Sequence, residues 1–162
     1  MYKVAIITAS DKGYAGERED KSGSVIEEIV TAHELEVTGK VILPDDRQML
    51  SDQMLNYCHQ GIDLILTTGG TGFSKRDVTP EATADIVERR ADNLTFAMIA
   101  NSLHYTPKAM LSRGIAGIRE NTLIVNLPGS PKAVRENLEY AIDAIIHGVK
   151  ILKGDDAECA RK

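Results

Sequence analysis

The sequence has few aromatic residues and no tryptophan. Its 162 residues include only two phenylalanines and five tyrosines, so aromatic residues make up 4% of the chain. A flavin ring is usually held by stacking against aromatic side chains. The composition therefore disfavours a flavin-binding protein of the flavodoxin type, although that kind of fold would suit the order of elements described below.

The sequence also lacks concentrated positive charge. Its formal net charge is −5 and its isoelectric point is near 5.4, and no run of lysine or arginine interrupts this acidic balance. The negative electrostatic field of such a protein repels nucleic acid, so we expect no nucleic-acid partner. Any phosphate group would have to be held by local devices such as backbone N–H groups, helix N-termini or a metal ion.

Two further shortages bear on location. The only cysteines, Cys58 and Cys159, are far apart and have no metal-ligand spacing, which indicates free thiols in a reducing compartment. Near the N-terminus only residues 4–7 are strongly apolar, which is too short for a signal peptide or a membrane span. We therefore expect a cytoplasmic protein without a membrane partner.

Common catalytic signatures are missing as well. No Gly-Lys-Ser/Thr sequence completes a P-loop, and no Gly-x-Ser-x-Gly sequence forms a hydrolase nucleophile elbow. The histidines share no ligand spacing, and each lies on or near an expected helix; they are His33, His59, His104 and His147. These patterns remove P-loop enzymes and serine hydrolases from consideration and assign no chemistry to histidine.

The hydrophobic pattern alternates between short apolar runs and amphipathic segments. Strands are expected at 4–7, 37–43, 64–66 and 123–125, and helices from 22, 47, 80, 94 and 131. This rhythm predicts parallel βαβ units in one domain over 1–154, followed by a polar tail over 155–162. Residues 117–118 are expected to pair antiparallel with 123–125. Thr79 is expected to cap a helix in which Pro80 is the first residue.

Small, hydroxyl and acidic residues follow four of the expected strands. They occupy residues 8–11, 44–46, 67–77 and 126–131. In an open parallel sheet, ligands bind in the crevice outside the carboxyl ends of the strands. The four loops therefore predict a binding site at that edge of the sheet.

Two of these loops are suited to phosphate. The first is glycine-rich and supplies Thr68, Gly69, Gly70, Thr71 and Gly72, whose backbone can approach a ligand closely. The second contains Pro128, Gly129, Ser130 and Pro131, and it opens a helix whose free N–H groups favour an anion, with Lys132 beside them. Each loop also has a purely structural interpretation, as a tight turn or an ordinary helix start.

Asp45 and Asp77 follow different strands but are expected to face the same crevice. Two carboxylates near phosphates suggest a bridging divalent cation, and Mg²⁺ is the natural choice. Alternatively, each aspartate caps a turn with its side chain, which aspartate does often.

Taken together, four ordered motifs resemble the molybdopterin adenylyltransferases, the Mog and MoaB family. The motifs are residues 67–72, Arg76-Asp77-Val78-Thr79-Pro80-Glu81, Leu111-Ser112-Arg113 and residues 126–131. The resemblance runs from Val4 to about Leu152. It implies a three-layer α/β/α domain with a mostly parallel sheet, assembled as a homotrimer or a dimer of trimers. It also implies that AMP is transferred from ATP to the terminal phosphate of molybdopterin with Mg²⁺, and it leaves room for a molybdenum-insertion enzyme as a partner.

The resemblance assigns roles to particular positions. Asp45 and Asp77 correspond to the two functionally important aspartates, and they would hold Mg²⁺ or the nucleotide. The glycine-rich loop and the 128–131 loop would grip the phosphates, with Ser10, Asp11 and Ser112 nearby. Arg76 and Lys132 would neutralise charge in the transition state.

One segment departs from the family pattern. Relatives usually carry Pro-Gly followed by an acid and a Met-Arg pair, whereas this chain has residues 92–99 with Phe96 in place of the acid and Ile99 in place of the arginine. Lys75 also stands where proline is frequent. Two alternatives therefore stay open: a non-catalytic relative that binds molybdopterin, and a nucleotide pyrophosphatase on the same fold.

Overall fold

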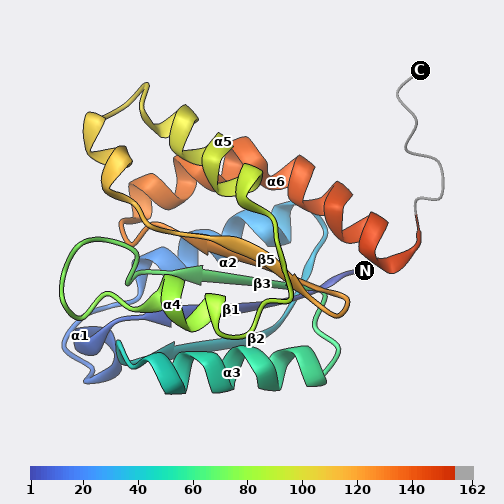
Figure 1. Cartoon of the computed structure of the whole chain (residues 1–162), viewed down its shortest axis with the longest axis horizontal. Helices are drawn as coiled ribbons and strands as arrows, with labels where there is room; N and C mark the ends of the chain where they lie inside the picture. The colour runs from blue at the N-terminus through green and yellow to red at the C-terminus, as the bar shows by residue number, and fades with distance from the viewer. Residues whose placement is uncertain (156–162) are drawn as a thin grey trace.

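The computed structural model describes residues 1–155, so Cys159 and residues 156–162 of the expected tail lie outside the described part. A six-stranded sheet forms the middle layer of the molecule, with helices on both faces (Figure 1). The strands are β1 Lys3–Ala9, β2 Glu36–Leu43, β3 Leu64–Thr68, β4 Arg89–Arg90, β5 Ala116–Arg119 and β6 Thr122–Leu127. The helices are α1 Asp11–Tyr14, α2 Lys21–Ala32, α3 Arg47–His59, α4 Thr79–Ala84, α5 Asp92–Ser102, the 3₁₀ helix η1 Pro107–Leu111 and α6 Pro131–Lys153.

The strand order across the sheet is β2-β1-β3-β6-β5-β4. The first four strands are parallel, whereas β5 runs antiparallel to β6 and β4 antiparallel to β5. The chain moves from β1 outward to β2 and then crosses back to place β3 on the other side of β1. The strand order therefore reverses beside β1, and this is the position at which open α/β sheets bind ligands.

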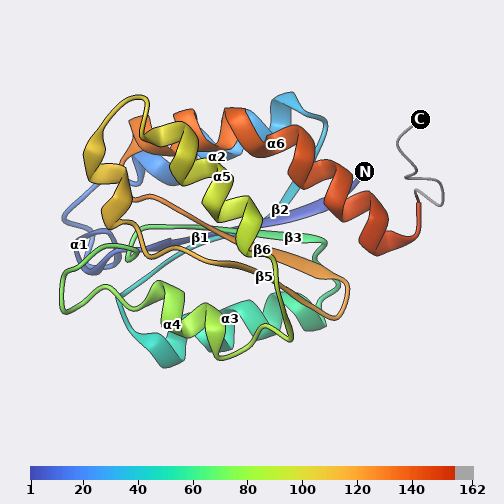
Figure 2. The same cartoon turned by 45° about the horizontal axis from the view of Figure 1, so that its top comes forward.

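Both faces of the sheet are buried, which explains why the strands read as continuous apolar runs. Along β1, Val4 and Ile6 face α2, α5 and α6, while Ala5 and Ile7 face α3 and α4. Figure 2 shows these two helical layers above and below the sheet. The expected three-layer α/β/α architecture is confirmed.

The expected helices and strands are present, and the 117–118 segment pairs with β6 as predicted. Three short elements, α1, β4 and η1, were not predicted, because four, two and five residues are too few to show a periodicity. The expectation for Thr79 was wrong. Val78 is the N-cap of α4 and Thr79 is its first residue. The Thr79 N–H donates to the Gly70 carbonyl over 3.1 Å, and its buried Oγ1 caps no N–H, having no hydrogen-bond partner among the described residues. Among the described residues, no helix is long and apolar enough to cross a membrane.

Candidate functional site

A polar crevice of about 780 Å³ opens at the carboxyl ends of β1 and β3. The loops that form it lie on the left of Figure 1, opposite the two labelled termini. Of the residues predicted from the sequence, this crevice brings together Ser10, Asp45, Thr68, Gly69, Gly70, Asp77, Gly129 and Ser130. It also contains residues that were not predicted, namely Arg18, Glu19, Asp20, Lys21 and Ser22.

The glycine-rich loop has a backbone shape that only glycine adopts easily. Gly69 and Gly70 have φ angles of +86° and +68°. A Cβ atom on Gly69 would lie 2.3 Å from the carbonyl oxygen of Ala9 at the end of β1. Thr68 donates from Oγ1 to the Pro128 carbonyl over 2.6 Å, and this bond ties the loop to the one that follows β6. The two loops thus form a single wall.

Asp45 lies at the base of the crevice in an unusual environment. Its Oδ2 accepts from the Asp11 N–H over 3.1 Å, and its own N–H donates to Asp11 Oδ1 over 3.0 Å. Its other oxygen, Oδ1, is buried and has no hydrogen-bond partner among the described residues. Burial raises the pKa of this carboxyl, although the bond from Asp11 acts in the opposite direction. A buried oxygen without a partner is the kind of atom that a ligand or ion completes.

Asp77 faces the same crevice from the end of the glycine-rich loop. Its Oδ2 accepts from the Ser74 N–H over 3.1 Å, so the aspartate also shapes the turn that carries it. The turn-capping role that was the alternative for Asp77 is thus also present. Beside Asp45, it is Asp46 that caps α3, by accepting from the Met49 N–H over 2.8 Å. Asp45 and Asp77 both line the crevice, as the sequence predicted.

Arg76 and Lys132 do not line the crevice. Arg76 donates through Nε and Nη2 to the two carboxylate oxygens of Asp11 over 3.0 and 2.9 Å. This pairing lowers the pKa of Asp11. Lys132 lines a separate open groove beside α5 and α6. The basic side chains of the crevice are instead Arg18 and Lys21.

The loop before α2 was the part of the site that sequence reasoning missed. Asp20 accepts from Thr8 Oγ1 and from the Gly23 N–H, each over 2.9 Å, and so joins the end of β1 to the start of α2. Ser22 donates from Oγ to the Gly129 carbonyl over 2.6 Å. The available signal was the N-cap pattern Asp20-Lys21-Ser22-Gly23, which marks a second helix start on the same crevice.

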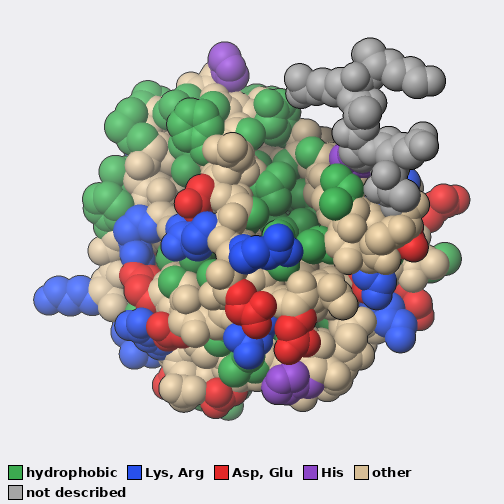
Figure 3. Space-filling model, turned by 45° about the vertical axis from the view of Figure 1, so that its right-hand side comes forward, with side chains coloured by type: hydrophobic (Ala, Val, Ile, Leu, Met, Phe, Trp, Pro, Cys, Tyr) green, Lys and Arg blue, Asp and Glu red, His purple; other side chains and the backbone are tan. Residues whose placement is uncertain are grey.

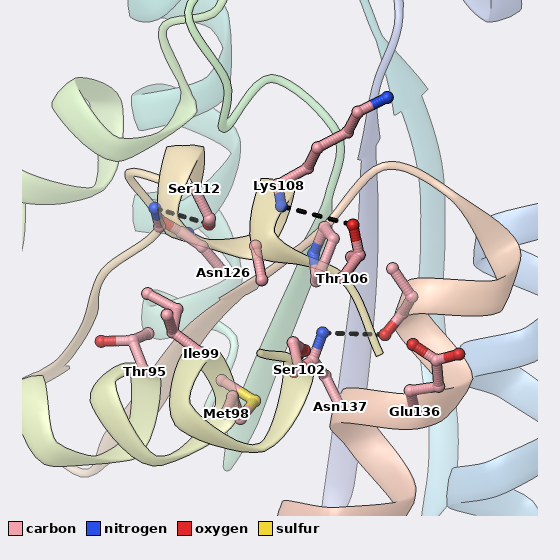
Figure 4. Close-up of a pocket in the computed structure, with 14 residues that line it drawn as sticks. Thr95, Met98, Ile99, Ser102, Thr106, Lys108, Ser112, Asn126, Glu136 and Asn137 are labelled. Atoms are coloured by element: carbon pink, nitrogen blue, oxygen red, sulfur yellow. Dashed lines mark hydrogen bonds between the residues drawn. The ribbon is translucent and has the colours of Figure 1, made fainter. Parts of the chain in front are cut away.

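A second, mostly apolar cavity of about 220 Å³ lies between α5, η1 and α6 (Figure 4). Its apolar lining includes Met98, Ile99, Ala109, Pro128 and Ala133. Its polar lining consists of Thr95, Ser102, Thr106, Lys108, Ser112, Asn126, Glu136 and Asn137. Ser112, predicted as a neighbour of the phosphate loops, belongs to this cavity.

The crevice and the cavity share one wall, which is the loop after β6. Pro128 lines the cavity, and the next residues, Gly129 and Ser130, line the crevice. Ser130 is the N-cap of α6 and accepts from the Ala133 N–H over 3.1 Å, as expected. The start of this 23-residue helix therefore faces the crevice with its positive dipole end. Of the remaining predicted residues, Thr71 is buried, and the Gly72 carbonyl accepts from Arg113.

Asp45 and Asp77 suit a divalent cation that is also bound by substrate phosphates better than a metal ion held by protein side chains alone. Within residues 1–155, no group of three or more His, Cys, Asp or Glu side chains is placed to hold a metal ion. Mg²⁺ is usually bound by one or two carboxylates together with substrate phosphates and water. Asp45, with its unpartnered Oδ1, and Asp77 match that donor set.

Comparison with known proteins agrees with this geometry. Residues 5–147 match the family described as "Probable molybdopterin binding domain". The chain belongs to this molybdopterin-binding family. A crystal structure of the molybdopterin biosynthesis enzyme MoaB from Thermus thermophilus is similar, with 42% identity and a TM-score of 0.90, covering 95% of this chain and 98% of that one.

Curated relatives in the family include enzymes. The molybdopterin adenylyltransferase of Helicobacter pylori strain J99 is 38% identical over 155 residues, which cover 94% of this chain and 88% of that protein. Gephyrin of Dictyostelium discoideum is 41% identical over 92% of this chain, and the matched part spans only 22% of gephyrin. The family resemblance drawn from the sequence motifs is thereby confirmed.

Proposed function

We propose that this protein is a molybdopterin adenylyltransferase, which transfers AMP from ATP to the terminal phosphate of molybdopterin. One observation carries the proposal: an apolar cavity and a polar crevice lie on opposite sides of a single loop, Pro128–Ser130. A pterin with a phosphate-bearing side chain has the same two-part character. The similarity to an enzyme of that name over most of both chains supports the assignment.

The two compartments divide the substrates by polarity. The pterin ring suits the cavity, where apolar side chains cover its faces and a few polar groups, such as Ser102 and Ser112, meet its edge. The phosphates suit the crevice, which offers the start of α6, the glycine-rich loop and the side chains of Arg18 and Lys21. In this proposal Arg76 acts indirectly, by holding Asp11 beside Asp45.

The chemistry requires little from an acid or a base. The terminal phosphate of molybdopterin is an anion at neutral pH, so it can attack the α-phosphate of ATP without losing a proton, and pyrophosphate departs. The barrier lies in bringing two anions together in line, so positioning and charge neutralisation supply most of the catalysis. Asp45 and Asp77 would hold Mg²⁺, whose chemistry here would be to neutralise phosphate charge.

We further propose that the protein forms a homotrimer or a dimer of trimers in the cytoplasm and passes its product to a molybdenum-insertion enzyme. Support for assembly comes from large apolar side chains that are exposed on α5 and η1, including Phe96 at 71% and Met110 at 65%. Figure 3 shows hydrophobic side chains gathered in the upper part of the molecule, where these elements lie. Contiguous exposed apolar surface of this kind marks an interaction site.

A non-catalytic molybdopterin-binding relative is the second candidate function. It is favoured by Ile99, which lines the apolar cavity at the position where the family pattern has an arginine. A neutral side chain there removes one possible contact to an anionic substrate. Such a protein would bind molybdopterin but release no pyrophosphate.

The deciding experiment is chromatography of a reaction that contains the purified protein, molybdopterin, ATP and Mg²⁺. We expect adenylyl-molybdopterin and an equal amount of pyrophosphate. Asp77→Asn should lower turnover about 100-fold with little change in molybdopterin affinity, because the carboxylate acts on charge in the transition state. Asp52→Asn is the matched control, since that exposed carboxylate accepts from Gln48 within α3 and does not line the crevice. Bound pterin without product would establish the non-catalytic alternative.

A further inference from the structure

The Leu111-Ser112-Arg113 motif contains an arginine to which the proposed chemistry gives no role. Arg113 lines neither the crevice nor the cavity. We infer that Arg113 is a positioning residue, which holds the glycine-rich loop and the backbone of Asp77 in the geometry that adenylyl transfer requires. This inference rests on the proposed function, and it adds a residue that touches no substrate.

The contacts of Arg113 reach both ends of residues 72–77, the segment that joins the last glycine of the glycine-rich loop to Asp77. Its Nε donates to the Gly72 carbonyl over 2.7 Å, and its Nη2 donates to the Asp77 carbonyl over 2.9 Å. Its backbone N–H donates to the Thr71 carbonyl over 2.8 Å. Its third side-chain nitrogen, Nη1, pairs with Glu81 in the first turn of α4. One side chain therefore spans residues 72–77 and fixes Gly72 and Asp77 relative to each other.

Other contacts also hold this loop. The Thr79 N–H donates to the Gly70 carbonyl over 3.1 Å, Arg76 pairs with Asp11 at the exposed tip, and Asp77 bonds Ser74 within the loop. Residues 73–76 are exposed, so packing does not hold them. In the absence of the Arg113 bonds, the Gly72 and Asp77 carbonyls lose their side-chain donor, and the exposed Arg76–Asp11 pair is left to hold the segment between them, so it should open more often.

Arginine is needed here because of its shape. The planar guanidinium presents five donors in a rigid fork, whereas the lysine ammonium is a point charge on a flexible stem. Lysine at position 113 could satisfy one carbonyl or the Glu81 carboxylate, but it could not hold all three at fixed spacing. The Arg113→Lys variant therefore keeps the charge and removes the geometry.

Arg113 also joins the two compartments of the proposed active site. The preceding residue, Ser112, lines the apolar cavity, while Arg113 holds the loop that lines the crevice. Two adjacent residues therefore act on the two parts of the site: Ser112 on the position of the pterin and Arg113 on the position of Asp77. A displaced Asp77 would leave the cavity unchanged, so molybdopterin binding should survive while turnover falls.

The first test is the kinetics of Arg113→Lys. We expect kcat to fall roughly 10- to 100-fold, since misplacement by about 1 Å has effects of that size. The KM for molybdopterin should stay within about twofold, because the variant leaves the cavity intact. Arg135→Lys is the matched control: Arg135 forms ion pairs with Glu28 and Glu139 and lines neither the crevice nor the cavity. Equal kcat values for the two variants would overturn the inference.

Two more variants separate the carbonyl bonds from the ion pair. Arg113→Ala should lose still more turnover and regain part of it when millimolar guanidinium chloride is added, because free guanidinium can bind the same carbonyls. Glu81→Gln breaks the ion pair but leaves the bonds to Gly72 and Asp77, so it should lose less turnover than Arg113→Lys. If Glu81→Gln loses as much, the ion pair and not the carbonyl bonds positions the loop, and the inference is wrong.

A readout that is independent of activity distinguishes this inference from the proposed function. Amide hydrogen exchange in residues 71–79 should become at least about tenfold faster in Arg113→Lys and stay unchanged in Arg135→Lys. If the wild-type protein forms no adenylyl-molybdopterin, the proposed function fails, but the exchange result still decides whether Arg113 holds the loop. Unchanged exchange in Arg113→Lys would overturn the inference even in an active enzyme.

Discussion

Replacing Gly69 with alanine tests whether the glycine-rich loop is shaped by its contact with β1. Gly69 has φ = +86°, and an added Cβ would lie 2.3 Å from the Ala9 carbonyl oxygen, closer than Cβ atoms approach in real proteins. Ala9 is the last residue of β1 and is paired with Leu43 of β2, so its backbone resists displacement. The loop must therefore shift outward, and it takes Thr68 and Gly70 with it.

The size of the effect can be separated into two parts. Positive φ costs an alanine about 1 kcal/mol, and forcing an extra methyl group against packed atoms costs about 2 kcal/mol more. Gly61 provides the control, because its φ is +74° and nothing lies within 4 Å of its Cβ position. Gly61→Ala should therefore show the first cost alone. In a chain of this length the thermal midpoint should fall by about 3 °C for Gly61→Ala and by about 9 °C for Gly69→Ala.

The assay combines thermal unfolding at a fixed protein concentration with the adenylyl-transfer reaction. We expect Gly69→Ala to lose at least about 100-fold in turnover, because the displaced loop carries groups of the crevice. Gly61→Ala should keep its turnover, since Gly61 lies in the turn after α3 and does not line the crevice. Equal midpoints for the two variants, with turnover retained in Gly69→Ala, would refute the steric argument.

Three further predictions concern charge, buried polarity and metal. Arg76 lowers the folded pKa of Asp11, so its stabilisation is present above the ordinary pKa of 3.8 and is lost as the pH falls through the lowered value. Urea unfolding should thus show Arg76→Gln less stable than wild type at pH 6 and equal to it below the lowered pKa; a pH-independent difference would contradict this. Asn126→Leu should cost about 3 kcal/mol in urea unfolding, because the buried amide bonds Thr67, Thr83 and the Ile115 N–H; a loss below about 1 kcal/mol would show that these bonds are replaced. Removal of Mg²⁺ with a chelator should stop product formation and leave the thermal midpoint unchanged, and turnover that persists would rule out the metal.

The order of helices and strands could be predicted from the sequence because it depends on local periodicity. Runs such as 4–7 and 64–66 are apolar on both faces of a strand, and α6 repeats its apolar residues at helical spacing. These patterns show which side chains of each element are buried, and a helix or strand is recognised from the spacing of its buried side chains. The short α1, β4 and η1 escaped prediction because they have too few residues to form a pattern.

Part of the site was predictable for a related reason. Parallel strands bring their carboxyl ends to one edge, so the loops after β1, β2, β3 and β6 had to meet, and Asp45 and Asp77 with them. The family motifs added what these loops bind. Neither argument depended on where an individual side chain points.

The tertiary structure alone decided which side chains share a compartment. Arg76 lies 65 residues from Asp11 along the chain, and only the folded loops show that it pairs with that carboxylate and leaves Arg18 and Lys21 to line the crevice. Ser112 similarly belongs to the apolar cavity, although its neighbour Arg113 reaches the glycine-rich loop. The physical reason is that periodicity records burial along one element, whereas the partner of a side chain depends on strand register, loop path and rotamer, which are set by contacts between distant segments.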